Sequence, residues 1–271
     1  MLAALAVRAF RVTVYGHYAQ HARSFPWRAT RDPYRILVSE IMLQQTQADR
    51  VAEKYPTFIK RFPTVRSLAA ARLASVLRAW QGLGYNRRAK LLHEAARTIA
   101  KEHAGRVPRD SSALRKLPGV GAYTASAVAA FAFNQPVAMI ETNIRSVYLH
   151  RFFANKKGVD DKQLVPLIEQ TLDAGNPRKW YAALMDYGSY LKRTLPNPSR
   201  RSSRHTKQAP FVGSNRQLRG AIIRLLLEKP NQPFPSLARQ LHADVASVQK
   251  NLEQMRKEGL LKKQGSGFVA G

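Results

Sequence analysis

Two acidic residues of this 271-residue chain stand in apolar surroundings, where a carboxyl group has useful chemistry. Glu40 lies within the apolar stretch 36–43, and Glu141 directly follows the apolar stretch 136–140. Loss of hydration raises the pKa of a carboxyl group, so that it can serve as a general acid near neutral pH. The residues also permit plainer roles: Glu40 on the polar side of an amphipathic helix, and Glu141 at a helix N-terminus, where the helix dipole favours an acid.

A pair of carboxyl groups is the usual equipment for cleaving a glycosidic bond. One, in its protonated form, gives a proton to the leaving group, while the other, ionised, stabilises the cationic sugar. In a DNA-binding protein the bond of this kind is the N-glycosidic bond of a nucleotide, and the base must be flipped out to be reached. The two acids therefore indicate base removal, provided that the chain binds DNA.

The charge of the chain points to a polyanion as its partner. Lys and Arg number 45 against 17 Asp and Glu, and the net charge of +28 is far more than solubility needs. The hydrophobic content of 45% excludes a disordered basic tail protein. Residues 192–219 carry eight Lys or Arg and no acid. That stretch predicts a linker or an extended basic loop along a phosphate backbone, with Arg200, Arg201 and Arg204 as candidate DNA contacts; a solvated connector is the alternative.

The chain has no cysteine, which excludes disulfides, thiolate zinc sites and cysteine-ligated iron–sulfur clusters. No apolar run reaches the length of a membrane span, so no membrane partner is expected. Residues 1–22 carry apolar side chains at helical spacing and are interpreted as a first helix of the domain and not as a transit peptide. We therefore expect a cytoplasmic, nucleoid-associated protein without a cofactor.

A glycine-rich turn between two predicted helices is a candidate phosphate-binding device. The sequence Leu117-Pro-Gly-Val-Gly121 separates a short helix predicted over 111–116 from the small and apolar run 122–133, which is typical of a buried helix. Glycine lets a backbone approach a ligand closely, and the N-terminus of the second helix directs N–H groups at an anion. A plain turn between two helices is the alternative, because short connections containing glycine are common.

The remaining pattern predicts a mainly α fold followed by a smaller module. Helical spacing of apolar residues continues to residue 195, with a break expected at Pro56, and no convincing strand pattern occurs before residue 210. In residues 215–271, three short helical patterns precede two strand-like segments around a Gly-Ser-Gly turn. This order predicts a winged helix-turn-helix module. Lys262 and Lys263 favour contact with DNA there, although such modules also mediate contacts with proteins.

Five motifs together make the chain resemble the helix-hairpin-helix (HhH-GPD) DNA glycosylases of the endonuclease III superfamily, most closely the MutY-type A/G-specific adenine glycosylases. The likeness covers residues 8–195 in one register. It implies a two-lobed all-α fold for this part of the chain. The motifs are Pro26-Trp27-Arg28, Ser39-Glu-Ile-Met-Leu-Gln-Gln-Thr46, Gly82-Leu-Gly-Tyr85, Leu117-Pro-Gly-Val-Gly121 with Tyr123, and Glu141-Thr-Asn143.

The resemblance and the change of composition together predict three domains: a glycosylase core of two lobes, a basic loop or linker, and the winged helix. One core lobe contains the hairpin, and the other combines both ends of the core. The predicted bounds are 1–195 for the core, with 28–135 as the first lobe and 1–27 plus 136–195 as the second, 196–214 for the linker, and 215–271 for the winged helix.

The resemblance implies a role for each residue of the active site. Glu40 matches the acid that protonates N7 of an extruded adenine, and Glu141 is the second carboxyl. Tyr123 stands where the lyase members of the superfamily carry a lysine that forms a Schiff base, and a phenol cannot form an imine with C1′. A monofunctional glycosylase is therefore implied, with Asn143 helping to hold the pocket.

The same resemblance implies a set of DNA contacts. Gln45, Thr46, Leu83 and Tyr85 match residues that fill the gap left by the flipped base or contact the opposite base. The glycine-rich hairpin, residues 119–121, matches N–H groups that bind a phosphate. A monovalent cation at the carbonyls of Leu117 and Val120 is also compatible with the resemblance. Beyond the basic loop, the predicted DNA-binding residues are Gln44, Gln45, Thr46, Leu83, Gly84, Tyr85, Arg87, Gly119, Val120 and Gly121.

Three departures from the family pattern bear on activity. The family's second acid is Asp in an Asp-Gly-Asn context, whereas Glu141-Thr-Asn143 stands here, and the extra methylene moves the carboxylate by about 1 Å, enough to matter in a tight site. The iron–sulfur loop expected after Asp186-Tyr-Gly188 is absent, so residues 196–204 must hold that place without a metal. We expect no counterpart of the C-terminal domain that reads 8-oxoguanine in typical adenine glycosylases, with the predicted winged helix in its place.

We therefore expect a monofunctional base-excision-repair glycosylase that acts as a monomer on double-stranded DNA with a mismatched or damaged base. Adenine opposite G or 8-oxoguanine is the expected substrate. A thymine or uracil glycosylase acting on G mismatches is one alternative, since related mismatch enzymes also carry Tyr at the position of Tyr123. A catalytically weakened DNA-binding homologue is another, although the retained Glu40 argues against it.

Overall fold

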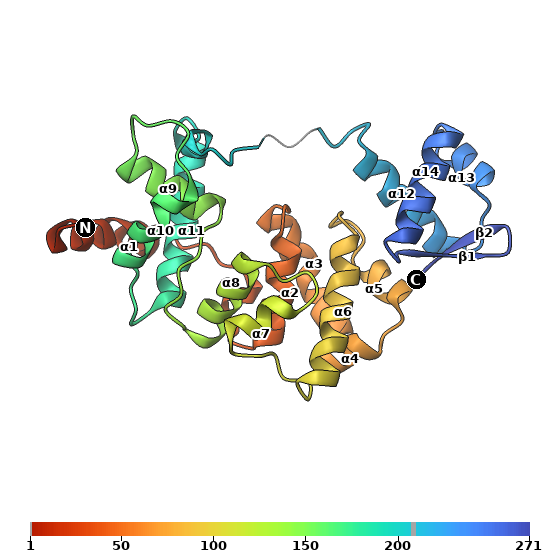
Figure 1. Ribbon diagram of the computed structural model, residues 1–271, viewed down its shortest axis with the longest axis horizontal. Helices are drawn as coiled ribbons and strands as arrows, with labels where there is room; N and C mark the ends of the chain where they lie inside the picture. Colours follow the sequence, from red (N-terminus) through yellow and green to blue (C-terminus); the bar gives the residue numbers. More distant parts are fainter. Residues whose placement is uncertain (1, 207–209) are drawn as a thin grey trace. The chain divides into compact units, whose positions relative to one another are not determined.

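The computed structural model describes residues 2–206 and 210–271, and helices dominate it (Figure 1). The predicted mainly α fold is confirmed: within the described residues, strands are confined to a C-terminal hairpin and two isolated bridges. No helix in this part of the chain is both long and apolar enough to span a bilayer. Residues 1 and 207–209, which belong to the predicted first helix and basic linker, lie outside the described residues.

The chain folds into two compact units and passes between them several times. The first unit comprises residues 2–37, 109–115 and 120–206. The second comprises residues 38–108, 116–119 and 210–271, so that the C-terminal segment belongs to the same unit as residues 38–108. The domain bounds predicted from the sequence stay a prediction.

The first unit is a bundle of helices joined by short connections. Its elements are α1 (Ala4–His21), the 3-10 turn η1 (Pro26–Arg28), α8 (Ala122–Phe133), α9 (Thr142–Phe152), α10 (Asp161–Thr171), α11 (Pro177–Thr194) and the 3-10 turn η2 (Pro198–Arg201). Helix α11 packs against α1, α8 and α9. In the core, the ring of Phe10 meets the rings of Tyr148 and Trp180 edge-to-face, with centroids 5.4 Å and 5.8 Å away. All three side chains are buried, as aromatic residues that anchor a core should be.

Helix α8 is the small and apolar helix that the sequence predicts after the glycine-rich turn. Its residues from Thr124 to Val128 are mostly buried, and Ala129 and Ala130 are fully so. Asn134 ends the helix because it adopts a left-handed backbone, with φ of 53°, and its N–H caps the carbonyl of Ala130 at 3.1 Å. The helix thus stops just before Pro136, which could not continue it.

The second unit begins within α2 (Pro33–Leu43) and continues through α3 (Ala48–Arg61), α4 (Val65–Ala70), α5 (Leu73–Ala79) and α6 (Arg87–Glu102). Helices α4 and α5 pack against α6. The break expected at Pro56 is wrong, because Pro56 lies inside α3. Proline removes one N–H from the helix, and burial of Tyr55 and Phe58 on the apolar face of α3 offsets that loss.

The C-terminal segment forms three helices and a hairpin, in the order that the sequence predicts. Its elements are α12 (Asn215–Glu228), α13 (Phe234–Gln240), α14 (Val245–Lys257), β1 (Leu261–Gln264) and β2 (Gly267–Ala270). The strands pair antiparallel, with Leu261 opposite Ala270. Helix α12 and strand β2 pack against α5, so residues 215–271, which we call the C-terminal module, are docked within the second unit (Figure 1). Its identification as a winged helix stays a prediction.

Candidate functional site

Glu40 lies in α2 with only 4% of its surface exposed. The flanking residues from Ile36 to Met42 are all buried as well, and Ser39 is fully buried. This burial excludes the alternative in which Glu40 stands on a solvent-facing side of an amphipathic helix. The side chain meets the condition of low hydration on which a role as general acid depends.

Glu141 is half-buried and is the N-cap residue of α9. Its Oε1 accepts a hydrogen bond from the backbone N–H of Ile144, with an N···O distance of 2.8 Å. Its Oε2 accepts one from Nδ2 of Asn143, at 3.2 Å. Burial raises the pKa of Glu141, against the opposing effects of the N–H groups of Asn143 and Ile144 and the positive charge of Lys192. Glu141 therefore does cap the N-terminus of α9, and its two hydrogen bonds fix the positions of both Glu141 and Asn143.

Gly188 of α11 lets the start of α9 lie against α11. A Cβ atom at Gly188 would come within 2.1 Å of the backbone oxygen of Asn143 and within 2.6 Å of its carbonyl carbon. Because those atoms are backbone, no side-chain movement could relieve the overlap. The glycine of the Asp186-Tyr-Gly188 motif thus sets the position of Asn143, and with it the cap made by Glu141.

The Pro26-Trp27-Arg28 motif has its partner in the same stretch of α11. Arg28 forms a two-pronged ion pair with the buried Asp186, with N···O distances of 2.7 Å and 2.8 Å. Arg23 adds a side-chain bond at 2.7 Å and a backbone bond at 2.9 Å to the same carboxylate. Although burial alone would raise it, the hydrogen bonds and charges of Arg28 and Arg23 hold the pKa of Asp186 below its ordinary value. These motif residues therefore stabilise the first unit.

The glycine-rich turn joins α7 (Ser111–Lys116) to α8, and its Gly119 lies against Leu91 of α6. Gly119 has a φ of 77°, and a Cβ atom there would lie 2.9 Å from the Cβ of Leu91. Both the backbone conformation and the space therefore require glycine. The Gly119 carbonyl accepts Nε2 of Gln44 at 3.3 Å, which ties the turn to the end of α2. Gly121 is exposed and forms the N-cap of α8.

Tyr123 lies in the first turn of α8, half-buried against the core of the first unit. Leu117 and Val120, whose carbonyls are the predicted cation ligands, have buried side chains. The cation stays a prediction. In the described residues, no cluster of His, Asp and Glu suited to a metal ion occurs.

Arg88, which the sequence did not single out, is the centre of the loops predicted to contact DNA. It is 8% exposed, and burial lowers its pKa to about 10, which leaves it charged at neutral pH. Its guanidinium spans the end of α2 and the turn before α6. The acceptors are the carbonyl oxygens of Ile41 (2.9 Å), Met42 (2.8 Å), Leu83 (3.2 Å), Gly84 (3.2 Å) and Gln44, and Oγ1 of Thr46 (2.9 Å).

A signal for Arg88 was present in the sequence. It occupies the same face of α6 as the buried Leu92, Ala95 and Ile99, at helical spacing. A charged residue in phase with a buried face needs partners inside the protein. Arg87, the predicted contact, is instead exposed.

Two residues on the loops that Arg88 joins have a left-handed backbone without being glycine. Gln45 has a φ of 56° and Tyr85 a φ of 47°. Such conformations are unfavourable for residues with a side chain, and they gather at functional sites. Gln45 is exposed and Tyr85 is half-buried, whereas the side chain of Leu83 is only 2% exposed and packs into the unit.

A pocket of about 340 Å³ opens beside these loops, entirely within the second unit. Gln44, Gln45 and Tyr85 line it from the loops, and α12 of the C-terminal module lines it from the other side with Arg216 and Ile223. Of the predicted DNA contacts, the structure therefore gathers Gln44, Gln45, Tyr85 and the exposed Arg87 at one place.

The first part of the predicted linker is a packed loop. Oδ1 of Asn197 accepts the N–H of Ser199 at 3.0 Å, and Ser199 and Ser202 are buried. Val159 donates to the carbonyl of Arg201 at 3.0 Å and accepts the N–H of Ser203 at 3.0 Å. Hydrogen bonds of this kind hold the segment that follows α11 in place.

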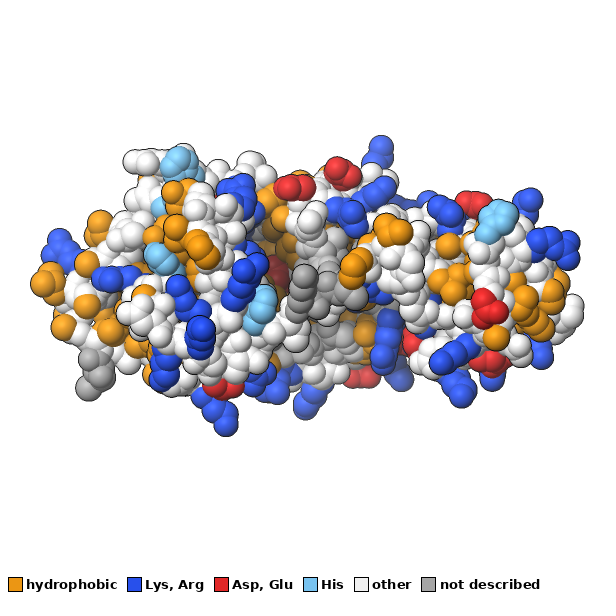
Figure 2. All heavy atoms as spheres, turned by 90° about the horizontal axis from the view of Figure 1, so that it is seen from above, with side chains coloured by type: hydrophobic (Ala, Val, Ile, Leu, Met, Phe, Trp, Pro, Cys, Tyr) orange, Lys and Arg blue, Asp and Glu red, His pale blue; other side chains and the backbone are white. Residues whose placement is uncertain are grey.

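The three arginines of this loop have different surroundings. Arg201 is half-buried and donates to the carbonyl of Leu149 at 3.4 Å, and Arg204 lies 3.6 Å from the carboxylate of Asp161. Arg200 is exposed. Lys and Arg side chains are more prominent than Asp and Glu over the face drawn in Figure 2.

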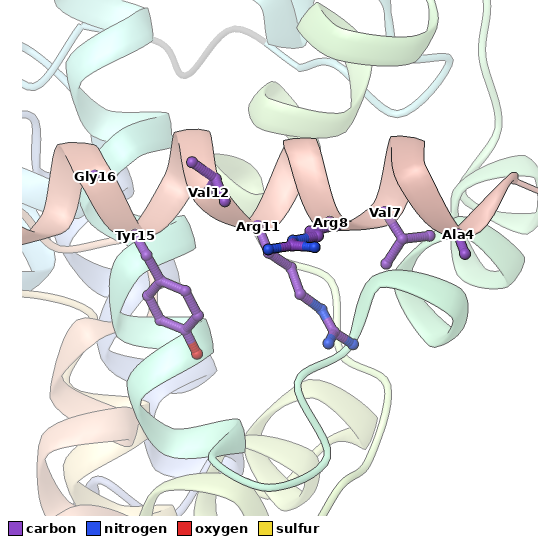
Figure 3. Close-up of a pocket in the computed structure, with 7 residues that line it drawn as sticks. All are labelled: Ala4, Val7, Arg8, Arg11, Val12, Tyr15 and Gly16. Atoms are coloured by element: carbon purple, nitrogen blue, oxygen red, sulfur yellow. The ribbon is translucent and has the colours of Figure 1, made fainter.

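A larger hollow, of about 690 Å³, runs along α1 (Figure 3). Arg11 and Tyr15 project from the same side of the helix. Nε of Arg11 donates to the carbonyl of Thr171 at 3.0 Å, and the Tyr15 hydroxyl donates to Asp173 at 2.5 Å. These groups fasten α1 to the end of α10, and no carboxyl group is among the residues lining the hollow.

Comparison with protein families and curated proteins gives concordant matches. The model of the HhH-GPD superfamily of base excision DNA repair proteins matches residues 38–171. Adenine DNA glycosylase of Mycobacterium tuberculosis (strain H37Rv) is 52% identical over 131 residues, which are 48% of this chain and 43% of that protein. Adenine DNA glycosylase of Mycolicibacterium smegmatis is 33% identical over 282 residues, covering 96% of this chain and 94% of that protein. The chain thus spans less than half of the first relative and nearly all of the second.

Solved structures show the same fold. A thermostable thymine-DNA glycosylase matches with a TM-score of 0.61 and 32% identity, over 68% of this chain and 86% of that one. Endonuclease III, in a trapped covalent complex with DNA, matches with a TM-score of 0.56 over 78% of this chain and 92% of that one. At 20% identity, the second match shows a common fold and nothing more.

Proposed function

Because this chain belongs to the HhH-GPD superfamily of base excision DNA repair proteins, we propose that it is a monofunctional DNA glycosylase that removes adenine paired with G or 8-oxoguanine. The observation that carries the proposal is the buried carboxyl of Glu40, 4% exposed in α2 and one helical turn from Gln44. The likeness to the Mycolicibacterium adenine DNA glycosylase, which extends over nearly the whole chain, supports adenine as the base.

The proposed reaction is hydrolysis of the N-glycosidic bond of an extruded nucleotide. Glu40 gives its proton to N7 of adenine, and the C1′–N9 bond breaks with its electron pair leaving on the base. The carboxylate of Glu141 stabilises the positive charge that develops on the sugar. Water then adds to C1′ and loses a proton, which returns Glu40 to its protonated form, so that the products are free adenine and an abasic site.

The residue at position 123 limits the reaction to hydrolysis. A lysine amine can attack C1′ and lead to strand cleavage through an imine, whereas the phenol of Tyr123 cannot form one. We therefore propose that the enzyme leaves the DNA strand intact. Gln44, Gln45, Tyr85 and Arg87 are the proposed contacts to double-stranded DNA in the second unit.

The experiment presents the full chain with duplexes that each contain one test pair: A with 8-oxoguanine, A with G, T with G, U with G, or hypoxanthine with T. Alkali then cleaves the abasic sites. We expect cleavage of the adenine strand and no cleavage before alkali. Cleavage of the T or U strand alone would assign the chain to thymine or uracil removal, the activity named for a relative from Methanothermobacter thermautotrophicus. Binding without product on every duplex would contradict an enzymatic function.

A further inference from the structure

The pocket beside Gln45 and Tyr85 has a wall that belongs to the C-terminal module. Arg216, in the first turn of α12, donates Nη1 to the hydroxyl of Tyr85 at 2.7 Å. Its guanidinium carbon lies 5.4 Å from the centroid of the same ring. Arg219 lines the pocket one turn further along and is paired with Glu258. The module therefore places cationic side chains directly against a residue proposed to contact DNA.

The module presents these arginines from a fixed support. Nη2 of Arg78 in α5 donates to the carbonyl of Leu227 in α12 at 2.9 Å. Gly259 lies so close to α6 that a Cβ atom there would be 2.8 Å from Cε of Lys90. Ile223 in α12 is only 2% exposed. Several contacts along the module therefore set the position of the first turn of α12.

The pocket has the chemistry of a site for a nucleobase. Arginine donates to O6 and N7 of guanine, which is the commonest specific contact to a base edge. In 8-oxoguanine N7 carries a hydrogen, so there the guanidinium would donate to O6 alone. The amides of Gln44 and Gln45 can both donate and accept, and the ring of Tyr85 offers a surface for stacking.

We propose that the C-terminal module forms one wall of the site that reads the base opposite the excised one, and that Arg216 selects a guanine-type base there. The inference rests on the proposed function, because it assigns the opposite-base site of that enzyme. Arg216 would act both by holding the ring of Tyr85 and by donating to the base.

The experiment uses duplexes in which a tetrahydrofuran abasic analogue replaces the target nucleotide. No glycosylase can cleave this analogue, so binding is measured apart from excision. The base opposite the analogue is G, 8-oxoguanine, C or T, and the affinity of the full chain is measured by fluorescence anisotropy at physiological salt. We expect the wild type to bind the duplexes with G or 8-oxoguanine about tenfold more tightly than those with C or T.

Arg216→Ala is expected to reduce this preference to about twofold or less. The matched control is Arg224→Ala, which removes the same charge from an exposed position of α12 outside the pocket. Arg224→Ala should keep the full preference, and any loss of affinity should be the same for all four duplexes. Thermal unfolding of both variants shows whether the module stays folded.

Tyr85→Phe tests the contact by removing only the hydroxyl group, even if Arg216→Ala destabilises the module. We expect Tyr85→Phe to lose part of the preference for guanine. In the double variant, the two losses should be less than multiplicative, because both substitutions remove the same contact. Losses that multiply in full would show that Arg216 and Tyr85 act separately and would contradict the inference.

Two outcomes with Arg216→Ala would overturn the inference. An equal loss on all four duplexes, matching Arg224→Ala, would make Arg216 a contact to phosphate. Tighter binding would mean that the module covers the DNA site. A wild type that excises adenine without any opposite-base preference also overturns the inference and leaves the proposed function intact. A wild type that prefers guanine but excises no base contradicts the proposed function alone.

Discussion

The two compact units hold their proposed catalytic carboxyl groups in different ways. Both Glu40 and Glu141 follow apolar stretches, so they look alike in the sequence. Glu40 lies beyond the first turn of α2, where the helix itself uses the backbone N–H groups. Glu141 stands just before α9 and accepts the N–H of Ile144 at 2.8 Å. The place of an acid relative to its helix therefore decides whether the free backbone N–H groups of a helix end can bind it.

This difference suits a division of labour between the two acids. A proton donor gains from a site that lacks water, whereas an acid that must stabilise a cation needs its negative charge. Backbone N–H groups at a helix N-terminus favour the charged form. In Glu141 that effect opposes burial, which raises the pKa of the carboxyl group. Substitutions at the two positions should therefore have different consequences.

Glu40→Gln is expected to have the largest effect. The amide has nearly the same shape but cannot give up a proton as an acid does, so the rate of adenine excision should fall by about 100- to 10,000-fold. Affinity for a duplex with an uncleavable adenine analogue should stay unchanged. Single-turnover kinetics and fluorescence anisotropy measure the two quantities.

The matched control for this substitution is Glu53→Gln, which removes a carboxylate from an exposed position of α3. It should excise adenine at the wild-type rate. Normal turnover by Glu40→Gln would show that Glu40 is not the proton donor. The two carboxyl groups would then not divide the proposed chemistry between them.

Arg88→Met is expected to have the next largest effect, and on stability. Methionine replaces part of the buried stem, but the carbonyl oxygens of Ile41 and Met42 lose their donor. Leaving several buried acceptors without a donor should lower the free energy of unfolding by about 3 kcal/mol, as measured by urea titration. Arg87→Met, at the exposed neighbouring position, should change it by less than about 0.5 kcal/mol. A similar small change for Arg88→Met would show that Arg88 does not hold the two loops.

Glu141→Gln should slow excision by about 100-fold, because the sugar cation loses its counter-charge. Unlike Arg88→Met, this substitution should stabilise the folded protein. Burial raises the pKa of Glu141 in the folded state, so the stability that its proton confers is present below the pKa of the unfolded state and is lost as the pH rises through the folded pKa. At pH 7 the variant should therefore unfold at a higher temperature than the wild type. The difference should disappear in acid, where both side chains are neutral.

Two readouts test this assignment of Glu141. Thermal unfolding across the pH range gives the stability difference, and single-turnover kinetics gives the rate. Glu141→Asp, which keeps the charge, should retain more activity than Glu141→Gln. A variant Glu141→Gln that is less stable than the wild type at pH 7 would show that the cap on α9 matters more than the burial of the charge.

The elements of the fold could be predicted because their signals are local. The run from Ala122 to Phe133 is apolar throughout, and a helix of that kind must be buried. The same reasoning placed Glu40 among apolar neighbours. The break predicted at Pro56 is wrong because burial of Phe58, whose ring meets that of Trp80 at the end of another helix, offsets the loss of one N–H.

The spacing in α6 indicates that Arg88 is buried, but its partners could not be predicted, because they lie on distant segments. One acceptor, the carbonyl of Ile41, lies 47 positions earlier in the chain. The need for glycine at position 188 is also set by a distant segment, because a side chain there would overlap the backbone of Asn143 on another helix. Composition likewise could not show which basic side chains of the predicted linker bind within the protein. Arg201 does so through Leu149, and Arg204 through Asp161.

The smallest expected effects distinguish the two neighbouring arginines of the loop after α11. Arg200→Ala should weaken binding to duplex DNA and reduce the slope of log affinity against log salt by about 1, because Arg200 is exposed and one phosphate contact is lost. Arg201→Ala should leave that slope unchanged and lower the free energy of unfolding by about 0.5 kcal/mol, since its hydrogen bond to Leu149, at 3.4 Å, is long. Salt titrations and urea unfolding separate the two effects. An equal change of slope for both variants would mean that the whole loop lies along the DNA backbone, as its composition suggests, and that the contacts of Arg201 within the first unit give way when DNA binds.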